Sequence, residues 1–97
     1  MDETLREKAQ TIAGLMAQMA NENRLLILCA LLEGPKTVGQ LGETVPHITG
    51  PALSQHLQKL RTAGLVDSTK HGQFVEYQIA DQRLYGLMER LKALYCA

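Results

Sequence analysis

The sequence has 97 residues, of which 45% are hydrophobic, and its ten Lys and Arg balance ten Asp and Glu at zero formal net charge. This length favours one domain over 1–97, and the charge balance argues against a wholly basic nucleic-acid coat or an acidic disordered tail. There is no run of roughly 20 apolar residues and no signal-peptide pattern at 1–4, so we expect a cytoplasmic protein with no membrane partner.

The first half of the chain is typical of a small helical bundle. Apolar residues at helical spacing predict a helix over 2–20. Asn21 is a good cap for a second helix that continues to Leu32 and is apolar nearly all round. Gly34 and the proline after it would end that helix. We therefore expect the second helix to be the buried centre of the domain.

Two shorter helices follow, joined by a tight turn. Thr37 has the spacing of a capping box and opens a third helix over 37–45. Thr49 caps a fourth helix over 50–63, which tolerates a proline in its first turn. Its expected inward face consists of leucines at helical spacing: Leu53, Leu57 and Leu60.

The last third of the chain predicts a β-hairpin and one more helix. Alternating residues indicate strands over 65–69 and 74–79, with a turn over 70–73 between them. Asp81 is expected to cap a last helix. The apolar stripe of that helix is Leu84, Leu87, Met88, Leu91, Leu94 and Tyr95. Four helices, two strands and a final helix predict a mostly α fold with a β-hairpin (α+β), a winged helix-turn-helix.

The fourth helix and the hairpin carry side chains that suit DNA. Amide side chains can bond adenine, and lysines can hold phosphates. The predicted DNA-binding residues are Thr49, Pro51, Ser54, Gln55, Gln58 and Lys59 on the helix and Lys70, His71 and Gln73 on the hairpin. The alternative is a solvated helix face beside an ordinary turn. Helix pattern, hairpin and charge together favour DNA.

Charge is distributed unevenly along the chain. Between residues 44 and 75 the only acidic residue is Asp67, whereas the same stretch holds four Lys and Arg and all three histidines... counted as Lys59, Arg61 and Lys70 with His47, His56 and His71 once the unpaired segment is read residue by residue. The neutral chain thus concentrates positive potential on one segment.

 The count in that sentence is corrected here: the stretch holds three Lys and Arg, not four.

The first and last predicted helices each carry an apolar stripe that a domain this small has little core to cover. Burying both stripes against a second copy would give a homodimer through the first and last helices. Two recognition helices would then lie about 34 Å apart, so the partner is expected to be double-stranded DNA with an imperfect palindromic operator. The alternative is that both stripes pack inside one chain.

Three segments resemble the ArsR/SmtB family of winged-helix repressors. They are ANENRLLIL at 20–28, ALSQHLQKLRTAGLV at 52–66 and GQFVEY at 72–77. The resemblance covers about residues 10–97, and it implies a transcriptional repressor that is not an enzyme. Gly50 and Pro51 depart from the polar pair that many relatives have at the start of the recognition helix.

The two cysteines resemble those of one branch of that family, the dithiol group that contains SqrR, BigR, YgaV and HlyU. Cys29 lies in the second helix, and Cys96 follows the last one. The resemblance implies that they form a redox-sensing pair, with reactive sulfur species (persulfide) or an oxidant as the inducer. Considered alone, Cys29 is more simply a core residue.

Two other readings stay open at this point. A metal(loid)-responsive repressor would need thiolates, or His with carboxylates, at helical spacing, and the third helix offers only Glu43. A winged-helix DNA binder without a thiol switch would use the same recognition helix. The sequence predicts no metal site and no cofactor, and it contains no phosphate-binding loop or nucleophile elbow.

Overall fold

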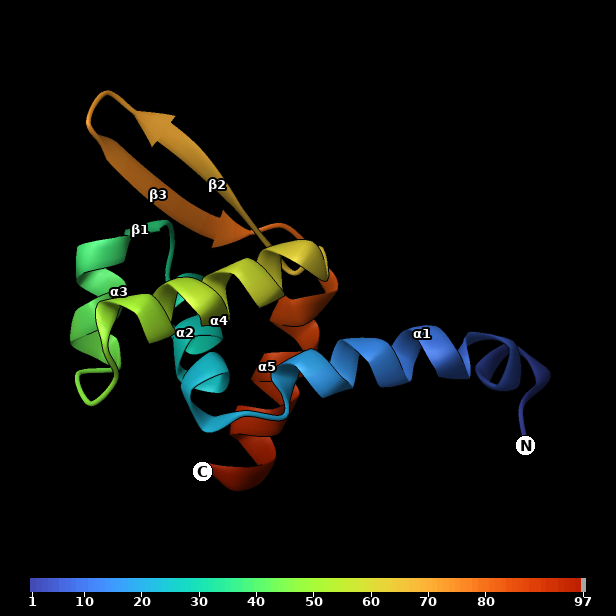
Figure 1. Ribbon diagram of the computed structural model, residues 1–97. Coiled ribbons are helices and arrows are strands. Elements are labelled where there is room, and N and C mark those ends of the chain that lie inside the picture. Colours follow the sequence, from blue (N-terminus) through green and yellow to red (C-terminus); the bar gives the residue numbers. More distant parts are fainter. Residues whose placement is uncertain (97) are drawn as a thin grey trace.

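The computed structural model describes residues 1–96 and has five helices and three strands in that range. Figure 1 shows their arrangement. The elements are α1 (Glu3–Met19), α2 (Glu22–Leu32), β1 (Lys36–Thr37), α3 (Val38–Thr44), α4 (Gly50–Thr62), β2 (Val66–His71), β3 (Phe74–Ile79) and α5 (Arg83–Tyr95). The predicted order of helices and hairpin is confirmed, with one strand added.

The core lies around α2. Ile27, Leu28 and Leu31 of this helix are buried, and α3, α4 and β3 pack against it. Each such side chain stabilises the fold by roughly 1.5–3 kcal/mol through burial. The predicted central helix is confirmed on this face, although Leu26, on its other side, remains exposed.

Three helices begin at the residues that the sequence predicts. Asn21 Oδ1 accepts a hydrogen bond from the Arg24 N–H at 3.1 Å. Thr37 and Gln40 form a reciprocal capping box at the start of α3. Thr49 Oγ1 accepts from the backbone N–H three residues later, at the start of α4. These contacts satisfy N–H groups that have no partner inside the helix.

The sheet has three antiparallel strands in the order β1-β3-β2. The sequence prediction missed β1, which has only two residues and therefore shows no alternation to detect. It also placed Lys70 and His71 in the turn. Both residues belong to β2, because they pair with Val75 and Phe74. The turn consists of Gly72 and Gln73, and the glycine takes a positive φ of 61° that favours a residue without Cβ.

The start of α5 differs from the prediction. Gln82 occupies the cap position and makes no capping hydrogen bond. Asp81 instead accepts from the Arg83 N–H at 3.0 Å and from the Arg83 guanidinium at 2.8 and 2.9 Å. These side-chain hydrogen bonds lower the pKa of the Asp81 carboxyl below its usual value. A salt-bridged turn therefore replaces the expected cap.

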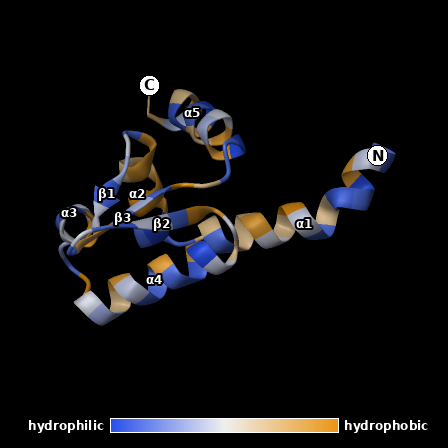
Figure 2. Cartoon of the chain, turned by 90° about the horizontal axis from the view of Figure 1, so that it is seen from above, coloured by the Kyte–Doolittle hydropathy of each residue, from blue (hydrophilic) through white to orange (hydrophobic). Residues whose placement is uncertain are grey.

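The two terminal helices leave much of their apolar surface open. Of the residues in α1 only Met19 is buried, and Met16 is 55% exposed. Figures 1 and 2 show α1 extending away from the rest of the molecule, with hydrophobic segments along it. In α5, Leu84 and Met88 are buried, but Tyr95 is 82% exposed. None of the helices within residues 1–96 is long and apolar enough to cross a bilayer.

Candidate nucleic-acid interface and thiol pair

The α4 helix separates a buried face from a polar face. Leu53, Leu57 and Leu60 are buried, as predicted, and they fix the rotation of the helix. The helical residues predicted to contact DNA are all exposed: Pro51, Ser54, Gln55, Gln58 and Lys59. The polar side chains therefore share one outward surface, as a recognition helix requires.

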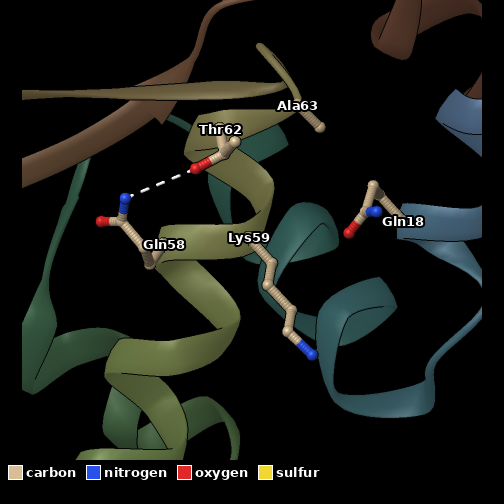
Figure 3. Close-up of a pocket in the computed structure, with 5 residues that line it drawn as sticks. All are labelled: Gln18, Gln58, Lys59, Thr62 and Ala63. Carbon is tan, nitrogen blue, oxygen red and sulfur yellow. Dashed lines mark hydrogen bonds between the residues drawn. The ribbon is translucent and has the colours of Figure 1, made fainter.

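Two of these polar residues already have partners within α4. Thr49 uses its hydroxyl oxygen to accept the capping hydrogen bond at 3.1 Å, which leaves its hydroxyl proton available to a phosphate oxygen. Gln58 Nε2 donates to Thr62 Oγ1 at 3.4 Å, as Figure 3 shows. Gln58 must leave this long contact before its amide can bond a base edge.

The hairpin carries the other predicted contacts. Lys70, His71 and Gln73 are exposed near its tip. His71 Nε2 lies 3.2 Å from Glu76 Oε1, so this histidine has an acidic neighbour that the sequence count between 44 and 75 did not include. Lys70 makes no ion pair with any residue in 1–96. The positive potential of the hairpin therefore rests mainly on Lys70.

An ion pair connects the hairpin to α4. Arg61 Nε lies 3.7 Å from Asp67 Oδ1, at the base of β2. Both side chains are more than half exposed, so the pair contributes little to stability. It shows, however, that the end of the recognition helix and the base of the hairpin lie side by side.

A pocket of about 230 Å³ lies between α1 and α4. Gln18 reaches it from α1 and Lys59 from α4, as seen in Figure 3. Arg24 holds Gln18 in place, because its Nη1 donates to the Gln18 backbone oxygen at 3.1 Å and to Oε1 at 2.8 Å. The sequence analysis missed Gln18 and Arg24, since no local motif connects them with α4.

His56 lies on the inner side of α4. Burial lowers the pKa of its imidazole below the usual 6.5, and the positive charges of Arg24 and Lys59 lower it further. Its Nδ1 is buried without a hydrogen-bond partner among residues 1–96. A neutral imidazole fits this position better than an imidazolium, so His56 supports the helix from within.

Both cysteines line one groove between α2 and α5. Cys29 is half-buried and Cys96 is exposed, and both thiols are free. The groove has a volume of about 250 Å³, and its other lining residues are Leu25, Met88, Leu91, Lys92 and Tyr95. The fold thus brings together two sulfur atoms from distant parts of the sequence. Such an arrangement can hold a reduced dithiol or, after adjustment of α5, a covalent bridge.

The same region offers little to a metal ion. Within residues 1–96 there is no group of three or more His, Cys, Asp and Glu side chains that could hold one. The two thiols are therefore not joined by a third ligand of this kind in the described chain.

Comparison with known families gives one clear match. The profile described as "Bacterial regulatory protein, arsR family" matches residues 21–68. These residues extend from the cap of α2 into β2, so they include the whole of α4.

Two characterised relatives cover most of the chain. The transcriptional activator HlyU of Vibrio cholerae is 43% identical over 82 residues, which are 84% of this chain and 75% of HlyU. The biofilm growth-associated repressor of Agrobacterium fabrum is 36% identical over 93 residues, which are 96% of this chain and 79% of the repressor. One is named an activator and the other a repressor, so the likeness extends to regulation of transcription but not to its direction.

Solved structures confirm the winged-helix fold. Reduced HlyU from Vibrio cholerae superposes with a TM-score of 0.88 at 36% identity, covering 99% of this chain and all of that one. A homodimeric winged helix-turn-helix DNA-binding domain from Mycobacterium bovis has a TM-score of 0.75 at 25% identity, covering 100% and 94% of the two chains.

Proposed function

Because the chain belongs to the arsR family of bacterial transcriptional regulators, we propose that it binds its operator as a homodimer and releases it when Cys29 and Cys96 become linked. One observation carries the proposal of a thiol switch: both cysteines line the same groove between α2 and α5. The other determinants support the DNA-binding half.

The unburied stripes of the terminal helices support a dimer. Ile12, Leu15 and Met16 of α1 face Leu84 and Leu87 of α5 across a second pocket, of about 220 Å³. A second copy would cover these side chains and continue the core. The homodimeric Mycobacterium bovis domain has the same fold.

In the proposed complex the polar face of α4 enters the major groove. Gln55 and Ser54 are exposed in its first half and can bond base edges, and Lys59 can hold a phosphate. The hairpin would follow the backbone or the minor groove through Lys70. Two-fold symmetry of the protein predicts an imperfect palindrome in the DNA.

The link between sulfur chemistry and DNA runs through α2. This helix packs against α4 on one side and contributes Cys29 to the groove beside α5 on the other. A bridge between the cysteines would fix α5 against α2 and so change the spacing of the two recognition helices in the dimer. A coupling free energy of about 1–3 kcal/mol, typical of such switches, would suffice to empty an operator.

The chemistry of the bridge depends on the inducer. In a disulfide, the two thiols lose two protons and two electrons, and an oxidant accepts the electrons. In a longer bridge, a persulfide supplies additional sulfur atoms between the two Sγ atoms. A disulfide also demands Cα atoms about 4.4–6.8 Å apart, whereas added sulfur relaxes this limit.

Gel shifts on a selected operator test the proposal. The reduced wild type should bind, and treatment with a persulfide donor should weaken its binding at least fivefold. Cys29→Ser and Cys96→Ser should bind with or without the donor. Equal binding by treated and untreated wild type would reject the thiol switch and leave an operator-binding regulator.

Mass spectrometry of the treated protein then identifies the bridge. A loss of two hydrogens between the peptides of Cys29 and Cys96 indicates a disulfide and an oxidant as inducer. A mass gain from extra sulfur atoms indicates a polysulfide bridge and a persulfide. Unmodified peptides under conditions that release DNA would contradict both.

A further inference from the structure

The tip of the hairpin exposes a large aromatic side chain. Phe74, the only phenylalanine of the chain, is 66% exposed at the first position of β3. Figure 1 shows the hairpin extending away from the helices, so the body of the domain does not cover its tip. An exposed aromatic ring at the end of a projecting hairpin is suited to contact another molecule.

The register assigns Phe74 to a particular face of the hairpin. It pairs with His71, and cross-strand partners lie on the same face of a sheet. Asp67 lies on that face as well, since it is two register steps of two residues from His71. Because Asp67 pairs with Arg61 of α4, this face begins beside the recognition helix.

The surroundings of Phe74 favour nucleic acid as its partner. Lys70 and Gln73, close to the ring, are exposed and can contact phosphates and base edges. The apolar stripes that suit a second copy lie instead on α1 and α5. The chemistry around the ring is therefore that of a DNA-contacting loop with one apolar residue.

We propose that Phe74 inserts its ring into the minor groove of the operator, against the sugars and base edges of a flexible pyrimidine–purine step. This inference rests on the proposed DNA-binding function. Apolar side chains inserted at such steps partly unstack the bases, and the cost depends on the sequence being deformed. Phe74 would thus select the flanks of the operator without hydrogen bonds to bases.

Three variants test the role of the ring. Phe74→Ala removes it, Phe74→Leu keeps an apolar side chain, and Val75→Thr is the matched control. Val75 is the neighbouring exposed apolar residue, and it points to the opposite face with Lys70. The operator is first selected from a random duplex library with the reduced wild-type dimer.

We expect Phe74→Ala to weaken operator binding about tenfold without changing its salt dependence, because no phosphate contact is lost. Phe74→Leu should lose less, and Val75→Thr should match the wild type. With 2-aminopurine at the contacted step, fluorescence should increase on binding of the wild type and not of Phe74→Ala.

The inference is overturned if Phe74→Ala binds the operator like the wild type, or if it changes the oligomeric state measured by light scattering. If no duplex is selected even at low salt, the proposed DNA-binding function itself fails. The two failures are therefore distinguishable.

Discussion

The centre of the molecule and its two terminal helices use apolar residues in different ways. In α2 and α4 the apolar side chains are covered by the chain itself, and Leu28 and Leu57 are essentially inaccessible. In α1 the same kind of stripe remains open, with Leu5 and Met16 about half exposed. The comparison teaches that helical periodicity reports which face is apolar, but not which molecule will cover it.

The largest expected effect lies in the centre. Leu57→Ala should destabilise the protein by about 2–5 kcal/mol, because it leaves a cavity where the fold has no spare side chain. Urea unfolding at two protein concentrations measures this loss, which should be the same at both. Met16→Ala is the comparison, and its smaller loss should depend on concentration. The contrast between the regions would be wrong if the two variants behaved alike.

A charge on the open stripe should sharpen the comparison. Met16→Glu places a carboxylate in the proposed dimer interface and should raise the dimer dissociation constant at least tenfold, as measured by sedimentation. Gln10→Glu introduces the same charge on the opposite side of α1 and serves as the control. A dimer unchanged by Met16→Glu would place the interface elsewhere.

The cap of α4 should have an intermediate effect. Thr49→Ala removes the oxygen that accepts the capping hydrogen bond and should cost about 1 kcal/mol of the free energy of unfolding. Thr49→Ser retains the hydroxyl and should lose much less. Chemical denaturation of the three proteins checks this, and identical stabilities would show that the cap is dispensable.

The smallest effect concerns pH. Because folding lowers the pKa of His56, the unfolded chain binds the proton more readily, and stability should decrease as the pH falls below about 6.5. At higher pH both states are neutral and the contribution is fully present. His56→Gln should flatten the curve of stability against pH between 5 and 7. An unchanged curve would assign the pH dependence to other groups.

Much of the fold was predictable because its signals are local. The caps at Asn21, Thr37 and Thr49 and the leucines of α4 each depend on residues within a few positions. β1 was not predictable, since two residues give no period and their pairing with β3 is made across the fold. The same holds for Gln18 and Arg24, which approach α4 only after the chain has turned back.

The candidate site shows a similar division. The DNA-facing residues of α4 follow from helical geometry, whereas the shared groove of Cys29 and Cys96 depends on how α5 packs against α2. No spacing in the sequence reports that packing, and only the resemblance to a family indicated it. The ion pair of His71 with Glu76 was missed because the acidic residue lies just beyond the basic segment.

The short strand β1 has a mechanical consequence for the hairpin. It pairs with β3 only at Tyr77 and Glu76, so the root of the hairpin is held on both edges. The two pairs nearer the tip, Lys70 with Val75 and His71 with Phe74, are held on one edge only. We therefore expect a stiff root with a compliant end, which lets one protein adapt to operators whose grooves differ in width.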